Sequence, residues 1–102
     1  MTQTTRTTRT LGTEKKAGAS VSTRTALIGI IVEDRESAAQ MNSLLHDYSE
    51  YIIGRMGVPH PKKPISIISI ALEADGNTIS ALSGKLGALP GISTKTIYAK
   101  TV

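Results

Sequence analysis

From about residue 23 onward, hydrophobic positions follow strand-like and helix-like patterns in turn. Four short apolar runs, rich in β-branched residues, predict strands over 26–32, 51–58, 65–72 and 92–100. Two intervening segments repeat apolar residues at spacings of three and four, which predicts an amphipathic helix in each. These residues are Ala38, Met41, Leu45 and Tyr48 in the first helix, and Ile79, Leu82, Leu86 and Leu89 in the second. Asp34 and Asp75 precede the helices and are suited to cap them.

The resulting βαββαβ order predicts an α+β fold, the ferredoxin-like sandwich. In this arrangement four strands form one antiparallel sheet, and the first and third strands lie at its centre. Each helix has a single apolar stripe, so both helices should cover the same face of the sheet. The other face is then left without a cover from the predicted elements.

The first strand is apolar on both sides, although a sheet with one wet face should alternate apolar and polar residues. Ala26, Ile28, Ile30 and Val32 share one side, and Leu27 and Ile31 lie on the other. The third strand repeats the pattern more weakly. An apolar patch of several hundred Å² usually marks an association surface. We therefore expect a homo-oligomer, a dimer or tetramer, with an interface lined by Leu27, Ile31, Ile68 and Ile70.

Residues 1–22 are rich in Thr and Arg and poor in large apolar residues, which predicts a disordered tail ahead of a folded domain over 23–102. The tail carries a charge of +3 out of the net +4, so the domain is nearly neutral. We expect no nucleic-acid partner for the domain, and weak nucleic-acid contact through the tail is the alternative. Without a long apolar run or a signal peptide, the chain should be cytoplasmic, with no membrane partner.

The composition excludes several kinds of chemistry. There is no cysteine, which rules out thiolate metal sites, disulfides and a cysteine nucleophile. His46 and His60 are too few to form a closed metal site by themselves. No arrangement typical of a nucleophilic triad or a phosphate-binding loop is present. We expect no catalytic residue, no metal and no cofactor.

Three charged residues are candidates for contact with a ligand. Arg55 lies within the second predicted strand between Gly54 and Gly57, where another backbone or a ligand can approach. It would act as a clamp for an anion at a subunit seam, or it would be a charge on an edge strand that reaches water. Glu33 and Asp34 cluster where the first strand meets the first helix, a position that also suits helix capping.

Several blocks of the chain closely resemble the family of iron-only hydrogenase system regulators. The resemblance covers about residues 23–100 and is carried by segments 26–35, 52–59, 65–69 and 79–87. It implies an ACT-like domain of ferredoxin type, distantly similar to the C-terminal domain of nickel-responsive regulators. The histidines and the cysteine that bind nickel in those regulators are not matched here, so the resemblance implies no metal site.

The expected function is therefore a non-enzymatic regulatory domain that forms a homo-oligomer in the iron-only hydrogenase system. Its partners would be a second copy of itself and a small-molecule effector or a protein of that system. Arg55, Glu33 and Asp34 are the expected ligand-facing residues. The alternative is a structural assembly or scaffold protein that binds no small ligand.

Overall fold

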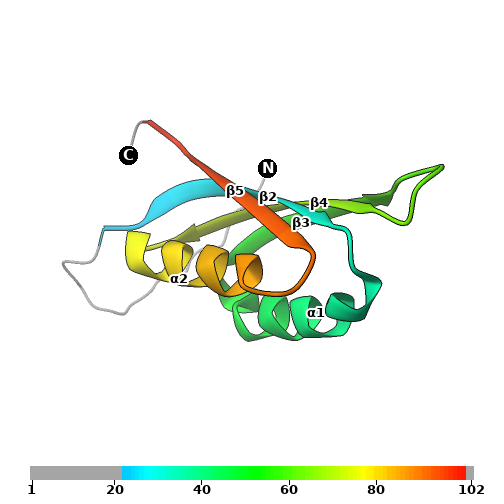
Figure 1. Cartoon of the computed structure of the whole chain (residues 1–102). Helices are drawn as coiled ribbons and strands as arrows, with labels where there is room; N and C mark the ends of the chain where they lie inside the picture. Colours follow the sequence, from blue (N-terminus) through cyan, green and yellow to red (C-terminus); the bar gives the residue numbers. More distant parts are fainter. Residues whose placement is uncertain (1–21, 101–102) are drawn as a thin grey trace.

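The chain folds into two layers, a four-stranded sheet and a pair of helices (Figure 1). This computed structural model describes residues 22–100. The predicted tail over 1–22 lies, apart from Ser22, outside the described residues. The strands are β2 (Arg24–Val32), β3 (Ile52–Pro59), β4 (Ser66–Ala74) and β5 (Ile92–Tyr98), and the helices are α1 (Ala38–Asp47) and α2 (Gly76–Gly87).

The sheet has the strand order β3-β4-β2-β5, with every neighbouring pair antiparallel. The first and third strands along the chain, β2 and β4, are therefore central, and the predicted ferredoxin-like α+β fold is confirmed. The register places Ile28 opposite Ile70 and Ile30 opposite Ile68. Directly opposed residues in a sheet point to the same face, so these four isoleucines share one side.

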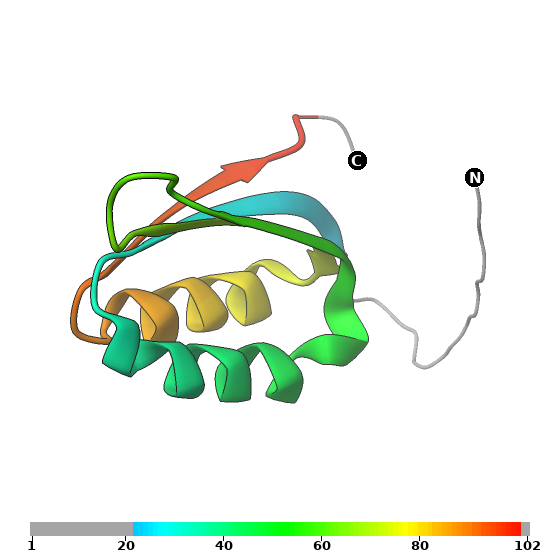
Figure 2. The same ribbon diagram turned by 90° about the vertical axis from the view of Figure 1, so that its right-hand side faces the viewer.

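Both helices lie beneath the same face of the sheet (Figure 2), as their single apolar stripes predict. Met41 and Leu45 of α1 are buried, and so are Ile79, Leu82 and Leu86 of α2. They pack against the helix-facing side of the sheet to form one core. The buried sheet residues are Ala26, Ile28, Ile30, Val32, Ile68, Ile70, Leu72, Ala74 and Ile92.

The helix beginnings differ in detail from the sequence expectation. Asp75 caps α2 as predicted, since its Oδ1 accepts a hydrogen bond from the backbone N–H of Thr78 at 2.7 Å. Asp34 instead caps a short 3-10 turn over Arg35–Ser37, where its Oδ1 accepts from the N–H of Glu36 at 2.9 Å. Helix α1 begins only after this turn, at Ala38.

The connection from α2 to β5 passes close to the connection from β2 to α1. Gly91 has a φ of 70°, and a Cβ at this position would lie 2.5 Å from the Cβ of Asp34. The carbonyl of Gly91 accepts a hydrogen bond from the N–H of Glu33, and Ser37 donates its hydroxyl proton to the carbonyl of Pro90. Glycine at position 91 thus permits two connections to meet at one end of the sheet.

Candidate functional site

The side of the sheet opposite the helices is called the open face below. Three rows of its residues run across all four strands, fixed by the strand register. The two outer rows are mostly apolar, and the middle row is small or polar on the central strands. The rows, each from β3 through β4 and β2 to β5, are Gly54, Ala71, Leu27 and Ile97; then Met56, Ser69, Gly29 and Lys95; then Val58, Ile67, Ile31 and Ser93.

Six large apolar side chains of the open face are exposed. Their exposed fractions run from 37% for Ile31 to 67% for Met56 and together amount to about three whole side chains. One end of the apolar surface is polar, because Thr23 and Thr25 donate hydroxyl protons to the carboxylate of Glu73. The six residues are Leu27, Ile31, Met56, Val58, Ile67 and Ile97.

Of the four interface residues expected from the sequence, two lie on the open face and two lie on the helix side. Leu27 and Ile31 lie on the open face, 40% and 37% exposed. Ile68 and Ile70 do not, because they share the side of Ile28 and Ile30 and are buried under the helices at 6% and 0% exposure. The residue of β4 that lies beside Ile31 on the open face is Ile67. The expectation for Ile68 and Ile70 was wrong, since both sides of β4 are apolar and the pattern alone cannot tell them apart.

The middle of the open face is hollow. A depression of about 360 Å³ lies over Gly29, and its lining includes Ile31, Ile67, Ser69 and Lys95. Lys95 is the single charged residue of the lining. Its two neighbours, Thr94 and Thr96, turn their hydroxyls toward Ser83 of α2, so Lys95 lies on the open face.

Arg55 lies on the edge strand β3, on the helix side of the sheet rather than on the open face. It pairs with Ile70, and its Nη2 donates a hydrogen bond to Oδ1 of Asn42 on α1 at 2.8 Å. Both partners are exposed. Arg55 therefore does not belong to a seam formed by open faces, and Asn42 is a partner that no pattern in the sequence indicates.

Glu33 and Asp34 are not close to Arg55. Arg55 shares a row of the sheet with Ile28, whereas Glu33 follows Val32, the last residue of β2. The rows of Ile28 and Val32 are four residues apart, or about 13 Å along the strands at about 3.3 Å per residue, and two strand spacings separate them laterally. The structure thus does not bring the three expected ligand-facing residues into one site.

A shallow groove of about 400 Å³ lies beside Arg55, between α1 and the edge strand. Its lining combines Arg55 with Asn42, His46 and Ser49, above the apolar side chains of Leu45 and Ile52. The lining contains a guanidinium group and an imidazole ring and no carboxylate. Arg55 therefore stays a candidate for contact with an anion. Its polar neighbours in the groove come from α1 and the turn after it, and Glu33 and Asp34 are not among them.

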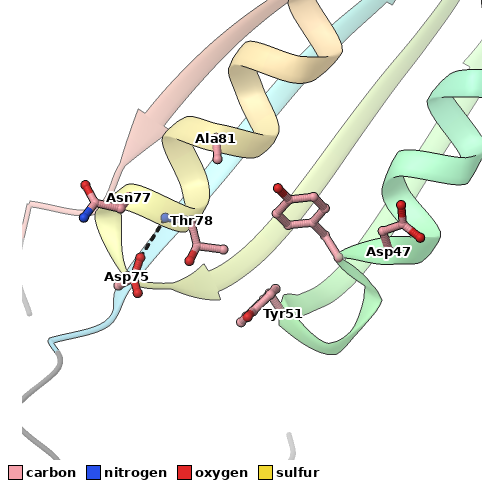
Figure 3. A pocket seen from close by; sticks show the side chains of 7 residues that line it. Asp47, Tyr51, Asp75, Asn77, Thr78 and Ala81 are labelled. Atoms are coloured by element: carbon pink, nitrogen blue, oxygen red, sulfur yellow. Dashed lines mark hydrogen bonds between the residues drawn. The ribbon is translucent and has the colours of Figure 1, made fainter.

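A second depression, of about 430 Å³, lies between the end of α1 and the start of α2 (Figure 3). Asp47 and Tyr51 lie on one side, and Asp75 and Thr78 lie on the other. Burial, followed by the neighbouring Glu50 carboxylate, raises the pKa of the Tyr51 hydroxyl. The hydrogen bonds from Thr78 lower the pKa of Asp75, so this carboxylate is ionised at neutral pH and already serves as the α2 cap.

The two histidines do not meet. His46 belongs to α1, while His60 lies after β3, where its Nδ1 accepts from the N–H groups of Lys62 and Lys63 at 3.0 and 3.1 Å. Within residues 22–100, no group of three or more histidine, cysteine or acidic residues is arranged to hold a metal ion. In the same range, no helix has the length and hydrophobicity needed to cross a bilayer.

These features define a small ferredoxin-like α+β domain in which no helix or strand within residues 22–100 covers the open face. The chain belongs to the TM1266-like family, described as "Iron-only hydrogenase system regulator, putative", whose model matches residues 24–96. A solved structure described as the uncharacterized protein TM1266 from Thermotoga maritima is 44% identical, with a TM-score of 0.73. The similarity covers 78% of this chain and 100% of that one. No curated protein matches this chain.

Proposed function

We propose that this chain is a non-enzymatic regulatory domain of the iron-only hydrogenase system, and that it acts as a homo-oligomer joined through the open face. Membership of the regulator family supports the regulatory role. The exposed apolar side chains of the open face are the observation that supports self-association. A cytoplasmic location, expected from the sequence, is part of the same proposal.

The energy available on the open face is large enough to favour self-association. A fully buried aliphatic side chain contributes about 1.5–3 kcal/mol, so the equivalent of three side chains contributes about 5–9 kcal/mol per copy. Two copies together would gain about 10–18 kcal/mol, against an association cost of about 4–15 kcal/mol. The gain less the cost runs from about −5 to about 14 kcal/mol, and the value of about 8 kcal/mol that corresponds to a micromolar dissociation constant lies within these limits.

A second copy is the cover that the chemistry favours. The first 21 residues, which lie outside the described range, contain Leu11 and Val21 as their only large aliphatic side chains after Met1. An open face lined by six large apolar side chains would find few matching groups there. A second open face offers the same six groups, and paired sheets pack well at about 10 Å separation.

The test is the mass of the full chain in solution, with two charge substitutions. Ile67→Glu places a carboxylate in an apolar row of the open face, between Ile31 and Val58. Ser80→Glu places the same group on the exposed side of α2 and is the matched control. We expect the wild type and Ser80→Glu to form dimers or larger species at about 10 µM and Ile67→Glu to be a folded single copy. A single-copy wild type, or assembly unchanged by Ile67→Glu, contradicts the proposal.

The regulatory role is tested in cells that make an iron-only hydrogenase. The chromosomal copy is replaced by Ile67→Glu or by Ser80→Glu, and hydrogenase activity and protein amount are measured per cell. We expect Ile67→Glu to change the activity, as deletion of the protein does, while Ser80→Glu leaves it at the wild-type level. An unchanged hydrogenase after deletion contradicts a role in this system.

A further inference from the structure

Gly29 is a residue that the fold of a single copy does not require. It lies in the middle of the central strand β2, where glycine is disfavoured relative to β-branched residues. A Cβ at this position would meet only the carbonyl oxygen of Lys95 at 3.8 Å, an ordinary contact. Gly91, by contrast, combines a φ of 70° with contacts to Asp34 under 3 Å. Glycine at position 29 therefore leaves space on the open face that a larger side chain would fill.

The space left by Gly29 is the hollow of the open face. Its walls are apolar on one side, formed by Ile31 and Ile67, while Ser69 and Ser93 contribute hydroxyl groups. Lys95, the cross-strand neighbour of Gly29, contributes the only charge, and no acidic residue lines the hollow. At about 360 Å³ the hollow is at the lower end of the range for small-molecule sites.

We propose that this hollow binds a small organic anion, a short branched aliphatic carboxylate, and that a second copy closes the site. The aliphatic body would lie over Gly29, against the adjacent side chains of Ile31 and Ile67. The carboxylate would accept hydrogen bonds from the Lys95 ammonium and from the hydroxyl of Ser93, which lies two residues away on the same side of β5. This proposal rests on the proposed function, because closure requires the open face to meet another open face.

Closure by a second copy has a thermodynamic consequence. A ligand that binds at a seam binds the assembled form better than the single copy, so ligand and assembly strengthen each other by the same factor. The proposed site would thus convert the concentration of a metabolite carboxylate into the fraction of assembled protein. The coupling between ligand binding and assembly is thus the proposed mechanism of regulation.

The first experiment measures binding of 3-methylbutanoate to the full chain by isothermal titration calorimetry and by backbone amide NMR shifts. The neutral amide of the same acid is the matched probe, since it has the same shape without the charge. We expect the acid to bind, with the largest shifts at positions 29, 69 and 95, and the amide to bind about tenfold or more weakly. Equal binding of acid and amide, or no binding of either by assembled protein, overturns the proposal.

Three variants locate the site. Gly29→Val fills the hollow and Lys95→Gln removes its charge, and each should lower the affinity for the acid by about tenfold or more. Lys62→Gln removes an exposed lysine of the β3–β4 connection that does not line the hollow, and should leave the affinity unchanged. Unchanged affinity in both Gly29→Val and Lys95→Gln overturns the proposal.

The mass of each variant separates this proposal from the proposed function. We expect Gly29→Val and Lys95→Gln to lose the gain in assembly that the acid produces. A wild type that stays a single copy contradicts the proposed function. Assembly lost in Gly29→Val without any acid present shows that a side chain of the second copy fills the hollow, and this overturns the ligand site while supporting assembly.

Discussion

Two isoleucines of β4, on opposite sides of the strand, should respond very differently to the same substitution. Ile70 is fully buried beneath the helices, and Ile67 lies on the open face with 41% of its surface exposed. Replacing a buried isoleucine by alanine costs about 2–5 kcal/mol, because apolar contacts are lost and a cavity remains. The described 79 residues, 22–100, correspond to a free energy of unfolding of about 4–12 kcal/mol at about 0.05–0.15 kcal/mol per residue.

Ile70→Ala should therefore remove a large part of the stability at every protein concentration. Ile67→Ala should have a small effect in the single copy and a larger one at concentrations where copies associate, because only association buries Ile67 fully. Urea unfolding, followed by circular dichroism at several protein concentrations, measures both effects. An Ile67→Ala cost equal to that of Ile70→Ala at the lowest concentration would refute the assignment of the two faces.

Three further substitutions test local parts of the structure. Gly84 lies in α2, and a Cβ added there would have no other atom within 4 Å, so Gly84→Ala should stabilise the fold by about 0.5–1 kcal/mol in urea unfolding. Gly91→Ala should destabilise it by more than about 1 kcal/mol, since φ is 70° and the new Cβ would overlap Asp34; equal stability would contradict this backbone assignment. The lowered pKa of Asp75 means that its ionised form stabilises the native state, so this contribution is present above the ordinary pKa and is lost as the pH falls through the lowered pKa. The loss of thermal stability on acidification should therefore be smaller in Asp75→Ala than in the wild type, and an identical pH profile would show that the cap contributes nothing.

Much of the fold follows from local sequence signals. The β-branched runs and the helical spacing predict the order of elements. The single apolar stripe of each helix predicts that both helices lie on one face of the sheet. Asp75 caps α2 as expected, because aspartate has a strong local preference for the position before a helix. The 3-10 turn after Asp34 was not predicted. Its last residue, Ser37, donates to the carbonyl of Pro90, a contact across 53 residues that no local pattern indicates.

The candidate site was harder to predict than the fold. An apolar residue on β4 does not reveal which side the helices cover, and that is why Ile68 and Ile70 were assigned to the interface in place of Ile67. The strand register decides which residues of β4 share a side with the buried residues of β2, and it depends on pairing between strands distant in the sequence. The hollow over Gly29 likewise depends on Lys95, which lies opposite it only in the folded sheet. Gly29 itself, a glycine within an apolar strand, was the local signal that could have indicated the hollow.

The central claim is that a second copy covers the open face. It is tested most directly by the accessibility of isoleucine methyl groups to a soluble paramagnetic probe, measured on the full chain at increasing protein concentration. Ile97 is 65% exposed in the single copy and Ile70 is fully buried, so these two residues mark the accessible and the protected limits of the measurement. The account predicts that the methyl groups of Ile67 and Ile97 become protected as concentration rises and approach the protection of Ile70. Methyl groups of Ile67 and Ile97 that stay as accessible at high concentration as at low concentration would contradict it.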